Sequence, residues 1–221
     1  TGETKAVSNL GRTNKGTYYE KINYAVGESH EPGSTFKVAA LMAALEDEII
    51  DTSSVVDTKR GVKTFYGRRI FDSHTGGYGE ISAAKALEVS SNIGLATIID
   101  EGYKDSPNKF IDRIKSFGLA DTIGIPIKGE GKPMIPEPGH SKWSKNALPS
   151  IAYGYNLRLT PLQTLNFYNA IANNGIMVKP RFIRKVRAWN QTIATFEKEV
   201  TNPKLASEKT ISEIQNILKN I

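Results

Sequence analysis

The sequence predicts an α+β fold, because strand-like segments near the two ends of the chain enclose a middle that is dominated by helical patterns. Alternating segments lie within the first 26 residues, apolar-periodic segments fill the middle, and a strand pair and an amphipathic helix follow. Strands and helices in separate runs are typical of α+β domains. The 221 residues, of which 39% are hydrophobic, suffice for one domain with its own core. We therefore expect residues 1–221 to form a single domain.

The first half of the chain contains a predicted hairpin and three predicted helices. Residues 4–10 and 19–26 alternate like strands on either side of an Asn-Lys-Gly turn, which favours a hairpin. A helix is expected over residues 34–50 after a Pro-Gly turn, and so apolar a helix should be buried. Turn residues and short strand-like pieces come next, before helical character returns over residues 82–101 and 107–117.

The second half begins with a connection over residues 118–149 that is rich in glycine and proline and longer than a typical loop. The segment 160–163 (TPLQ) then supplies an N-cap threonine, a proline at the first helical position and a glutamine that closes a capping box. The helix that it starts should end at about Asn173. A strand pair is predicted over residues 177–196, and an amphipathic helix over residues 207–221.

The composition excludes several classes of function. The chain has no cysteine, so it has no disulfide framework, thiol nucleophile or thiolate metal site. Its three histidines, His30, His74 and His140, lie far apart, and we expect no metal site. The net charge of +6 comes from short, separated basic groups without interleaved aromatic residues, which favours solvated basic faces over nucleic-acid binding.

Targeting signals are also missing from the sequence. No stretch approaches the roughly 18 apolar residues of a membrane-spanning helix, and the first residues lack the pattern of a secretory signal. We expect either a cytoplasmic protein or one whose N-terminal targeting region lies outside these 221 residues.

Ser34 and Lys37 are the first candidate catalytic residues. Their spacing of three places both side chains on one face of the predicted helix 34–50. Lys37 can accept the proton of the Ser34 hydroxyl if burial keeps its amine neutral. The preceding Pro-Gly turn places Ser34 in the first helical turn, where free backbone N–H groups favour developing negative charge.

The same Ser-x-x-Lys spacing occurs at Ser82 with Lys85 and at Ser106 with Lys109. The pattern alone therefore selects none of the three, since a solvated lysine near a capping serine gives the same letters. Only Ser34 opens a strongly apolar helix after a Pro-Gly turn. Only there would burial lower the pKa of the lysine amine toward neutral pH.

A second candidate element is the tripeptide Ser90-Ser91-Asn92, where a hydroxyl could relay a proton and an amide could hold a substrate carbonyl. Ser-x-Asn also occurs at residues 106–108 and 144–146, so the tripeptide alone also fits an ordinary serine and asparagine at a helix junction. Its combination with Ser34 favours a role for Ser90.

Three segments together resemble landmarks of class B penicillin-binding proteins, in the order of that family: residues 31–37 (EPGSTFK), 89–94 (VSSNIG) and 153–163 (YGYNLRLTPLQ). The opening residues 1–6 resemble the first strand of the same transpeptidase domain, so the similarity covers nearly the whole chain. The septal, division-associated members are most similar, with the elongation type as an alternative. The resemblance implies a penicillin-binding protein/serine β-lactamase-like fold, helix-rich, with an antiparallel sheet that is incomplete here.

The resemblance also implies the roles of the candidate residues. Ser34 would attack the carbonyl of the penultimate D-alanine of a peptidoglycan stem peptide, and Lys37 would take its proton. Ser90 would pass a proton to the departing D-alanine, while Asn92 would bind the substrate backbone. An amine of a neighbouring stem peptide would resolve the acyl-enzyme, and a β-lactam would acylate Ser34. The family uses no metal or organic cofactor.

The partners implied by the resemblance are peptidoglycan stem peptides, β-lactam antibiotics and the division or elongation machinery. The domain would lie in the cell envelope, on the periplasmic face of the inner membrane. An N-terminal transmembrane segment and a non-catalytic domain, both outside these residues, would anchor it there.

The third catalytic element of the family, a Lys-Thr-Gly or Lys-Ser-Gly strand, is missing from the 221 residues. The two Lys-Thr pairs, at residues 63–64 and 209–210, are followed by Phe65 and Ile211. We expect the chain to stop just before that strand, and loss of one oxyanion donor alone costs on the order of 10²–10³ in rate. The fragment should therefore be nearly inert, and its open sheet edge should favour dimers.

Two alternatives remain open from the sequence. A serine β-lactamase or D,D-carboxypeptidase would share the chemistry of Ser34 and Lys37, but it needs a residue that activates water. Glu130 and Glu137 are candidates that the sequence cannot assign to that role. A non-enzymatic sensor that keeps a stable acyl complex is the second alternative.

Overall fold

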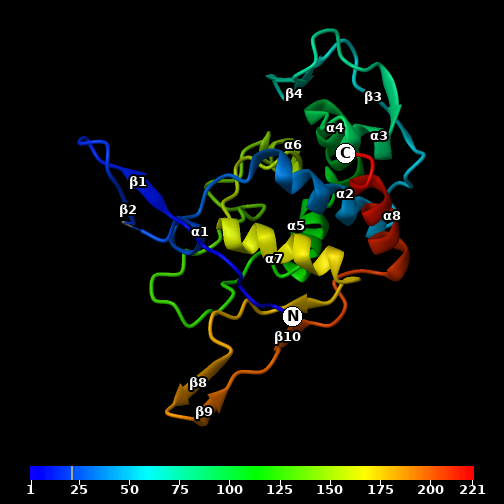
Figure 1. Ribbon diagram of the computed structural model, residues 1–221. Coiled ribbons are helices and arrows are strands. Elements are labelled where there is room, and N and C mark those ends of the chain that lie inside the picture. The colour runs from blue at the N-terminus through cyan, green and yellow to red at the C-terminus, as the bar shows by residue number, and fades with distance from the viewer. Residues whose placement is uncertain (21) are drawn as a thin grey trace.

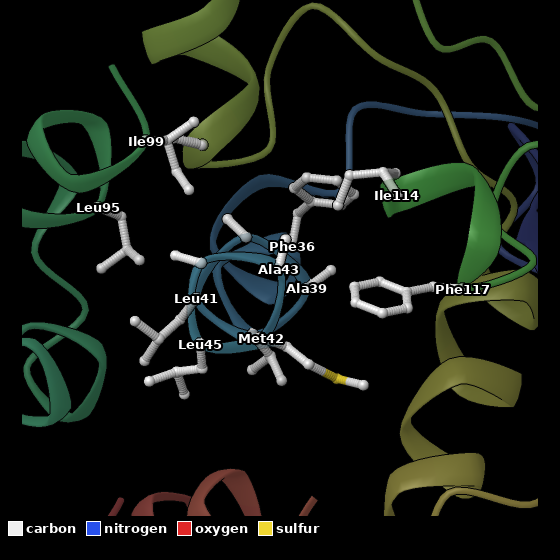
Figure 2. Close-up of a cluster of buried hydrophobic side chains, with 14 of the residues drawn as sticks. Phe36, Ala39, Leu41, Met42, Ala43, Leu45, Leu95, Ile99, Ile114 and Phe117 are labelled. Carbon is white, nitrogen blue, oxygen red and sulfur yellow. The ribbon is translucent and has the colours of Figure 1, made fainter. Parts of the chain in front are cut away.

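Helix α2 (Lys37–Glu46) is the centre of the fold in the computed structural model, which describes residues 1–20 and 22–221. Every residue of α2 from Lys37 to Leu45 is buried, as its apolar sequence predicts. Figure 2 shows its side chains leaving the helix in several directions, toward Leu95 and Ile99 on one side and Ile114 and Phe117 on the other. A helix that is apolar all round can be stable only when neighbours cover every face.

The neighbours of α2 are helices from distant parts of the sequence. It contacts α4 (Asn92–Tyr103), α5 (Pro107–Ser116) and α8 (Glu208–Leu218), with smaller contacts to two further helices. The remaining helical elements are α1 (Tyr24–Gly27), the 3₁₀ turn η1 (Gly33–Phe36), α3 (Ala83–Glu88), α6 (Ala147–Ala152) and α7 (Pro161–Ala172). Burial of these apolar faces against one another forms a single large core.

The strands of the described residues form five separate antiparallel ribbons of two strands each. The pairs are β1 (Leu10–Arg12) with β2 (Tyr18–Glu20), β3 (Val55–Asp57) with β6 (Glu80–Ser82), β4 (Val62–Phe65) with β5 (Arg68–Phe71), β7 (Met177–Val178) with β10 (Val200–Asn202), and β8 (Lys185–Ala188) with β9 (Gln191–Thr195). Figure 1 shows β1–β2 and β8–β9 projecting away from the helical body. The expected helix-rich α+β fold with an incomplete sheet is therefore confirmed.

Several elements lie where the sequence predicts them. Helices α5 and α8 occupy the predicted segments, and α7 begins with the predicted capping box. In that box the Thr160 hydroxyl accepts the N–H of Gln163, and the Gln163 side chain accepts the N–H of Thr160. The strand pair predicted over residues 177–196 is present as β8–β9, with Trp189 and Asn190 at the turn, but it begins only at Lys185. Residues 177–178 instead form β7, which pairs with β10.

The predicted N-terminal hairpin exists, but its bounds are wrong. It pairs Leu10–Arg12 with Tyr18–Glu20, so Gly11 lies inside a strand and residues 4–9 form none. Residues 24–26 of the second predicted strand lie in helix α1, because Val26 is buried in a small cluster with Ile125 and Leu162. This tertiary burial overrides the local strand preference. Lys21, within the same predicted strand, lies outside the described residues.

Two predicted helices differ from the structure. The helix expected over residues 34–50 begins as a 3₁₀ turn and ends at Glu46, since Glu48 has a positive φ of 54°. The stretch 82–101 is two helices rather than one. They are separated at residues 89–91, where Ser90 has a φ of 54°. A left-handed residue cannot continue a right-handed α-helix, so the first helix ends there and a new one begins.

The long connection predicted over residues 118–149 is present, although helix α6 already begins at Ala147. The Glu130 carboxylate organises part of it by accepting the backbone N–H groups of Ile123, Gly124 and Ile125. These bonds satisfy backbone donors that have no partner in a helix or strand. Local polar contacts therefore order part of the connection, and burial of Ile125 and a bridge between Met134 and Arg158 attach it to the rest of the fold.

Candidate active site

Ser34 and Lys37 lie together at the junction of η1 and α2. Ser34 is exposed in the 3₁₀ turn, whereas Lys37, the first residue of α2, is 1% exposed. The Lys37 Nζ lies 3.2 Å from the Ser34 Oγ, within hydrogen-bonding distance. The predicted spacing of three residues thus brings the two side chains together.

Ser90 completes a group of three side chains, from a part of the chain 53 residues away. The Lys37 Nζ donates to the Ser90 Oγ at 2.9 Å and to the Ser90 carbonyl at 2.5 Å. Ser90 is exposed and has a left-handed backbone, and both of these oxygens accept from the lysine. The amine is therefore buried between two exposed hydroxyls.

Burial lowers the pKa of Lys37 from 10.5 to about 8, and the negative charge of Asp72 opposes part of this shift. An ordinary lysine is almost wholly protonated at neutral pH. With a pKa near 8, a useful fraction of Lys37 is a neutral amine that can accept a proton. The site can therefore deprotonate the Ser34 hydroxyl and pass the proton to Ser90.

Asn92 lies at the first position of α4, two residues after Ser90, and is not hydrogen-bonded to the other three candidates. Its Nδ2 donates to the carbonyl of Phe71 at 2.7 Å, which fixes the amide against the end of β5. No group in the described part of the chain bonds to its Oδ1. The amide oxygen is therefore available to accept an N–H from a bound ligand.

The other two Ser-x-x-Lys matches have ordinary structural roles. Ser82 is the N-cap of α3, accepting the N–H of Lys85, and the side chain of Lys85 forms a surface ion pair with Glu88. Lys109 is exposed on α5. Of the three lysines only Lys37 is buried, which is the feature that separates it from the others.

Asp72 is a residue of the site that the sequence analysis missed. Its carboxylate accepts the Ser91 hydroxyl at 2.9 Å and the backbone N–H of Ile93 at 3.0 Å, on the residues that follow Ser90. A lone aspartate among turn residues, far from the Ser-x-Asn tripeptide in sequence, gives no local signal of this contact.

Gly154 is a second missed residue, and it positions the turn before Ser34. Its carbonyl accepts the N–H of Gly33 at 3.0 Å, and a Cβ at residue 154 would lie 1.9 Å from the Gly33 oxygen. Its φ of 84° also favours glycine. The signal was present in the Tyr-Gly-Tyr-Asn landmark of residues 153–156, which the sequence analysis used only for the resemblance.

Tyr168 of α7 holds the same turn through a second contact. Its hydroxyl donates to the carbonyl of Thr35 at 2.9 Å, and burial raises its pKa to about 12. The phenol therefore stays protonated and remains a donor at any physiological pH. The turn that carries Ser34 is fixed by contacts from two other parts of the chain.

The two glutamates considered as water-activating residues are engaged elsewhere. Glu130 accepts three backbone N–H groups of its own connection, and Glu137 forms a surface ion pair with Lys115 of α5. In the described structure neither carboxylate hydrogen bonds to Ser34, Lys37 or Ser90.

Residues 1–221 match the family description "Penicillin binding protein transpeptidase domain" over their whole length. The chain belongs to this family. The resemblance to class B penicillin-binding proteins that three sequence segments carry is thereby confirmed. None of the helices in the described residues is long and apolar enough to cross a membrane.

The chain is similar to curated penicillin-binding proteins and peptidoglycan transpeptidases. It is 26% identical over 199 residues to penicillin-binding protein PbpB of Mycobacterium tuberculosis, covering 90% of this chain and 28% of that protein. It is 29% identical over 191 residues to peptidoglycan D,D-transpeptidase FtsI of Escherichia coli, covering 84% and 31%. The chain thus spans about a third of the length of these relatives.

Solved structures of the family share its fold. Penicillin-binding protein 3 of Mycobacterium tuberculosis, in complex with aztreonam, has a TM-score of 0.76 at 26% identity, covering 89% of this chain and 42% of that one. The transpeptidase domain of penicillin-binding protein 3 from Burkholderia pseudomallei has a TM-score of 0.76 at 22% identity, covering 100% and 59%. The expected penicillin-binding protein/serine β-lactamase-like fold is confirmed.

Proposed function

We propose that this domain is the acylating centre of a peptidoglycan D,D-transpeptidase that cross-links stem peptides through an acyl-enzyme on Ser34. The observation that carries the proposal is the position of the Lys37 amine, buried and within hydrogen-bonding distance of the hydroxyls of Ser34 and Ser90. Family membership and the printed name of the FtsI relative support the substrate class.

In the acylation step, neutral Lys37 accepts the Ser34 proton as the Ser34 Oγ attacks the carbonyl of the penultimate D-alanine. The resulting ammonium is hydrogen-bonded to Ser90, so a proton can pass through the Ser90 hydroxyl to the nitrogen of the terminal D-alanine. The peptide bond breaks, D-alanine leaves with that proton, and the ester on Ser34 remains. Lys37 is neutral again.

In the second step an amine of a neighbouring stem peptide attacks the ester and loses its proton through the same two residues in reverse. An amide bond forms between the two peptides, and the Ser34 hydroxyl is restored. Asn92 contributes by accepting an N–H of the bound peptide on its Oδ1, since its Nδ2 is already fixed by Phe71. The reaction requires no metal or organic cofactor.

Labelling with a fluorescent penicillin tests the proposal in the whole protein that contains this domain. We expect one label per molecule, located on Ser34 by peptide mass spectrometry, because a β-lactam presents the same acylating carbonyl. Ser34→Ala should abolish the label, whereas Ser82→Ala, which alters a serine of the same spacing at a helix cap, should keep it. A label that survives in Ser34→Ala would refute the assignment.

Hydrolysis of a chromogenic cephalosporin by the same whole protein distinguishes the proposed transpeptidase from a β-lactamase. Because Glu130 and Glu137 are engaged away from Ser34, we expect a long-lived acyl-enzyme and little turnover of a chromogenic cephalosporin. Rapid hydrolysis would instead indicate a serine β-lactamase. A stable label without peptide cross-linking would indicate a sensor domain.

We infer a place for the whole protein in the cell envelope, with this domain on the periplasmic face of the inner membrane and a membrane anchor elsewhere in the protein. The relatives named FtsI and PbpB support a role with the division machinery. Depletion in the source bacterium distinguishes the two roles: filaments indicate division, and rounded cells indicate elongation.

A dimer is a further part of the proposal. The strands of the described residues form ribbons of only two strands each, so the incomplete sheet leaves strand edges open. Such an open edge can pair with another chain. Light scattering of the isolated domain should show a mass that rises with concentration, and a constant monomer mass would contradict the dimer.

A further inference from the structure

Asp72 directly follows β5. It lies in the segment of short ribbons between α2 and α3, residues 47–82, which we call the excursion. Its backbone N–H donates to the carbonyl of Gly61, which anchors it within the excursion. Its side chain leaves the excursion and reaches the helix junction, where it accepts from Ser91 and Ile93. A half-buried carboxylate thus links two parts of the fold at the residue next to Ser90.

The segment that Asp72 holds is a turn that needs support. Ser90 has a φ of 54°, in the left-handed region that a non-glycine residue adopts only at a cost. On the α3 side, the N–H of Ser90 donates to the carbonyl of Leu87 and the N–H of Ser91 to the carbonyl of Ala86. On the α4 side, the two bonds to the Asp72 carboxylate fix the residues that follow.

The Ser91 hydroxyl connects Asp72 to the start of α4. It accepts the N–H of Gly94 as the helix N-cap and donates its own proton to Asp72. The carboxylate also accepts the N–H of Ile93, so it places negative charge at the positive end of a helix of twelve residues. Charge-assisted bonds of this kind are stronger than bonds between neutral groups.

The charge of Asp72 also acts on the Lys37 amine. Burial lowers the lysine pKa, and Asp72 is the one ionisable group of the described residues whose charge counteracts that shift. The contacts of the Lys37 Nζ itself are the two oxygens of Ser90 and the hydroxyl of Ser34, all uncharged. Asp72 therefore acts on Lys37 through its charge and on Ser90 through the residues that follow it, without touching Ser34.

We propose that Asp72 is a positioning residue of this site, which fixes the turn that presents Ser90 and supplies the negative charge that acts on Lys37. The proposal rests on the proposed function, since it assigns Asp72 to the acylation of Ser34. If Asp72 has this role, the excursion between α2 and α3 contributes to the active site through the Asp72 side chain.

Two substitutions of Asp72 separate its charge from its hydrogen bonds. Asp72→Asn removes the charge but keeps an acceptor for Ile93 and a polar partner for Ser91. We expect its acylation by fluorescent penicillin to have an acid limb at lower pH than in the wild type, since Lys37 then loses its proton more easily. Asp72→Ala removes both features, and we expect its maximal acylation rate to fall roughly tenfold or more.

The matched control is Asp57→Asn in the same excursion, a partly exposed carboxylate that pairs with Lys59. It should leave both the acid limb and the maximal rate unchanged. A residue with a merely structural role would change the rate or the folded fraction, but it would not move the pH midpoint. An unshifted midpoint in Asp72→Asn, or an unimpaired maximal rate in Asp72→Ala, would overturn the proposal.

A measurement that does not depend on acylation completes the test. In whole protein carrying ¹³C-labelled lysine, the titration of Lys37, assigned by its loss in Lys37→Arg, should move to lower pH in Asp72→Asn and stay in place in Asp57→Asn. If the wild type is not labelled at Ser34, the proposed function fails, but this titration still decides whether Asp72 acts on Lys37.

Discussion

At the scale of single residues, the site depends on unequal burial of three side chains that share hydrogen bonds. Ser34 and Ser90 are exposed, whereas the amine between them is buried and has a lowered pKa. The hydroxyls can therefore meet a ligand, and the amine can act as a base at neutral pH. If the Lys37 amine were exposed, its pKa would stay near that of an ordinary lysine, and it would be protonated at neutral pH and unable to act as a base.

The pH dependence of acylation follows from this lysine. Its pKa is lowered to about 8, so about one molecule in ten carries the neutral base at pH 7. The acylation rate should rise with pH and reach half of its maximum near pH 8, as measured by penicillin labelling in buffers of pH 6 to about 9.5. Lys37→Arg should be inactive throughout, because a guanidinium stays protonated. A rate independent of pH would contradict the role of Lys37.

The close approach of Gly154 to Gly33 gives a second prediction. A Cβ at residue 154 would lie 1.9 Å from the Gly33 oxygen, so Gly154→Ala should displace the turn that carries Ser34. We expect loss of penicillin labelling and a lower melting temperature. Gly129→Ala is the control, because Gly129 has almost the same φ, 85°, with open space around it. It should lose only the stability that backbone strain at a positive φ costs, and equal effects would contradict the steric argument.

At the scale of elements, the break between α3 and α4 creates the site. If residues 82–101 formed one helix, the Ser90 hydroxyl and carbonyl would follow the helical path, and that carbonyl would bond within the helix. The left-handed Ser90 and the N-cap Ser91 instead start a new helix there. The break between the two helices thus leaves the Ser90 hydroxyl and carbonyl free to accept hydrogen bonds from Lys37 on α2.

The capping box of α7 gives a prediction at the scale of elements. Thr160→Ala removes a buried hydroxyl that accepts the N–H of Gln163, and it should lower the free energy of unfolding by about 1 kcal/mol. Ser106→Ala is the matched control, because Ser106 occupies the N-cap of α5 without a side-chain cap bond. Urea denaturation of both variants measures the difference, and similar losses would show that the Thr160 cap contributes nothing specific.

At the scale of the whole molecule, α2 joins the site to the core. Its first residue is Lys37, and the rest of its length is enclosed by α4, α5 and α8, as Figures 1 and 2 show. Because interiors are closely packed, the base cannot move without disturbing the core. The geometry of the site is therefore tied to the stability of the fold.

Truncation of a leucine in α2 tests whether the site depends on the stability of the core. Leu41 is completely buried, so Leu41→Ala should lower the free energy of unfolding by about 2–5 kcal/mol and reduce penicillin labelling near the melting temperature. Leu165→Ala, on the exposed side of α7 with 54% of its surface accessible, should change stability by about 0.5 kcal/mol or less. Comparable losses in the two variants, measured by thermal unfolding, would contradict a core centred on α2.

The sequence by itself determined the features that are encoded within one turn or one helix. The spacing of Ser34 and Lys37, the burial of α2, the capping box of α7 and the hairpin β8–β9 all follow from neighbouring residues. Such contacts join residues a few positions apart, so period, caps and turn residues suffice to predict them.

Only the tertiary structure decided how these pieces meet. The bond from Lys37 to Ser90 spans 53 residues, that from Ser91 to Asp72 spans 19, and that from Tyr168 to Thr35 spans 133. Local patterns do not encode which helix faces which, because packing depends on the shape of all the faces together. For the same reason the strand preference of residues 24–26 gave way to the burial of Val26. The contacts that Asp72 and Gly154 make with the site join residues far apart in the sequence, so only the folded chain shows them.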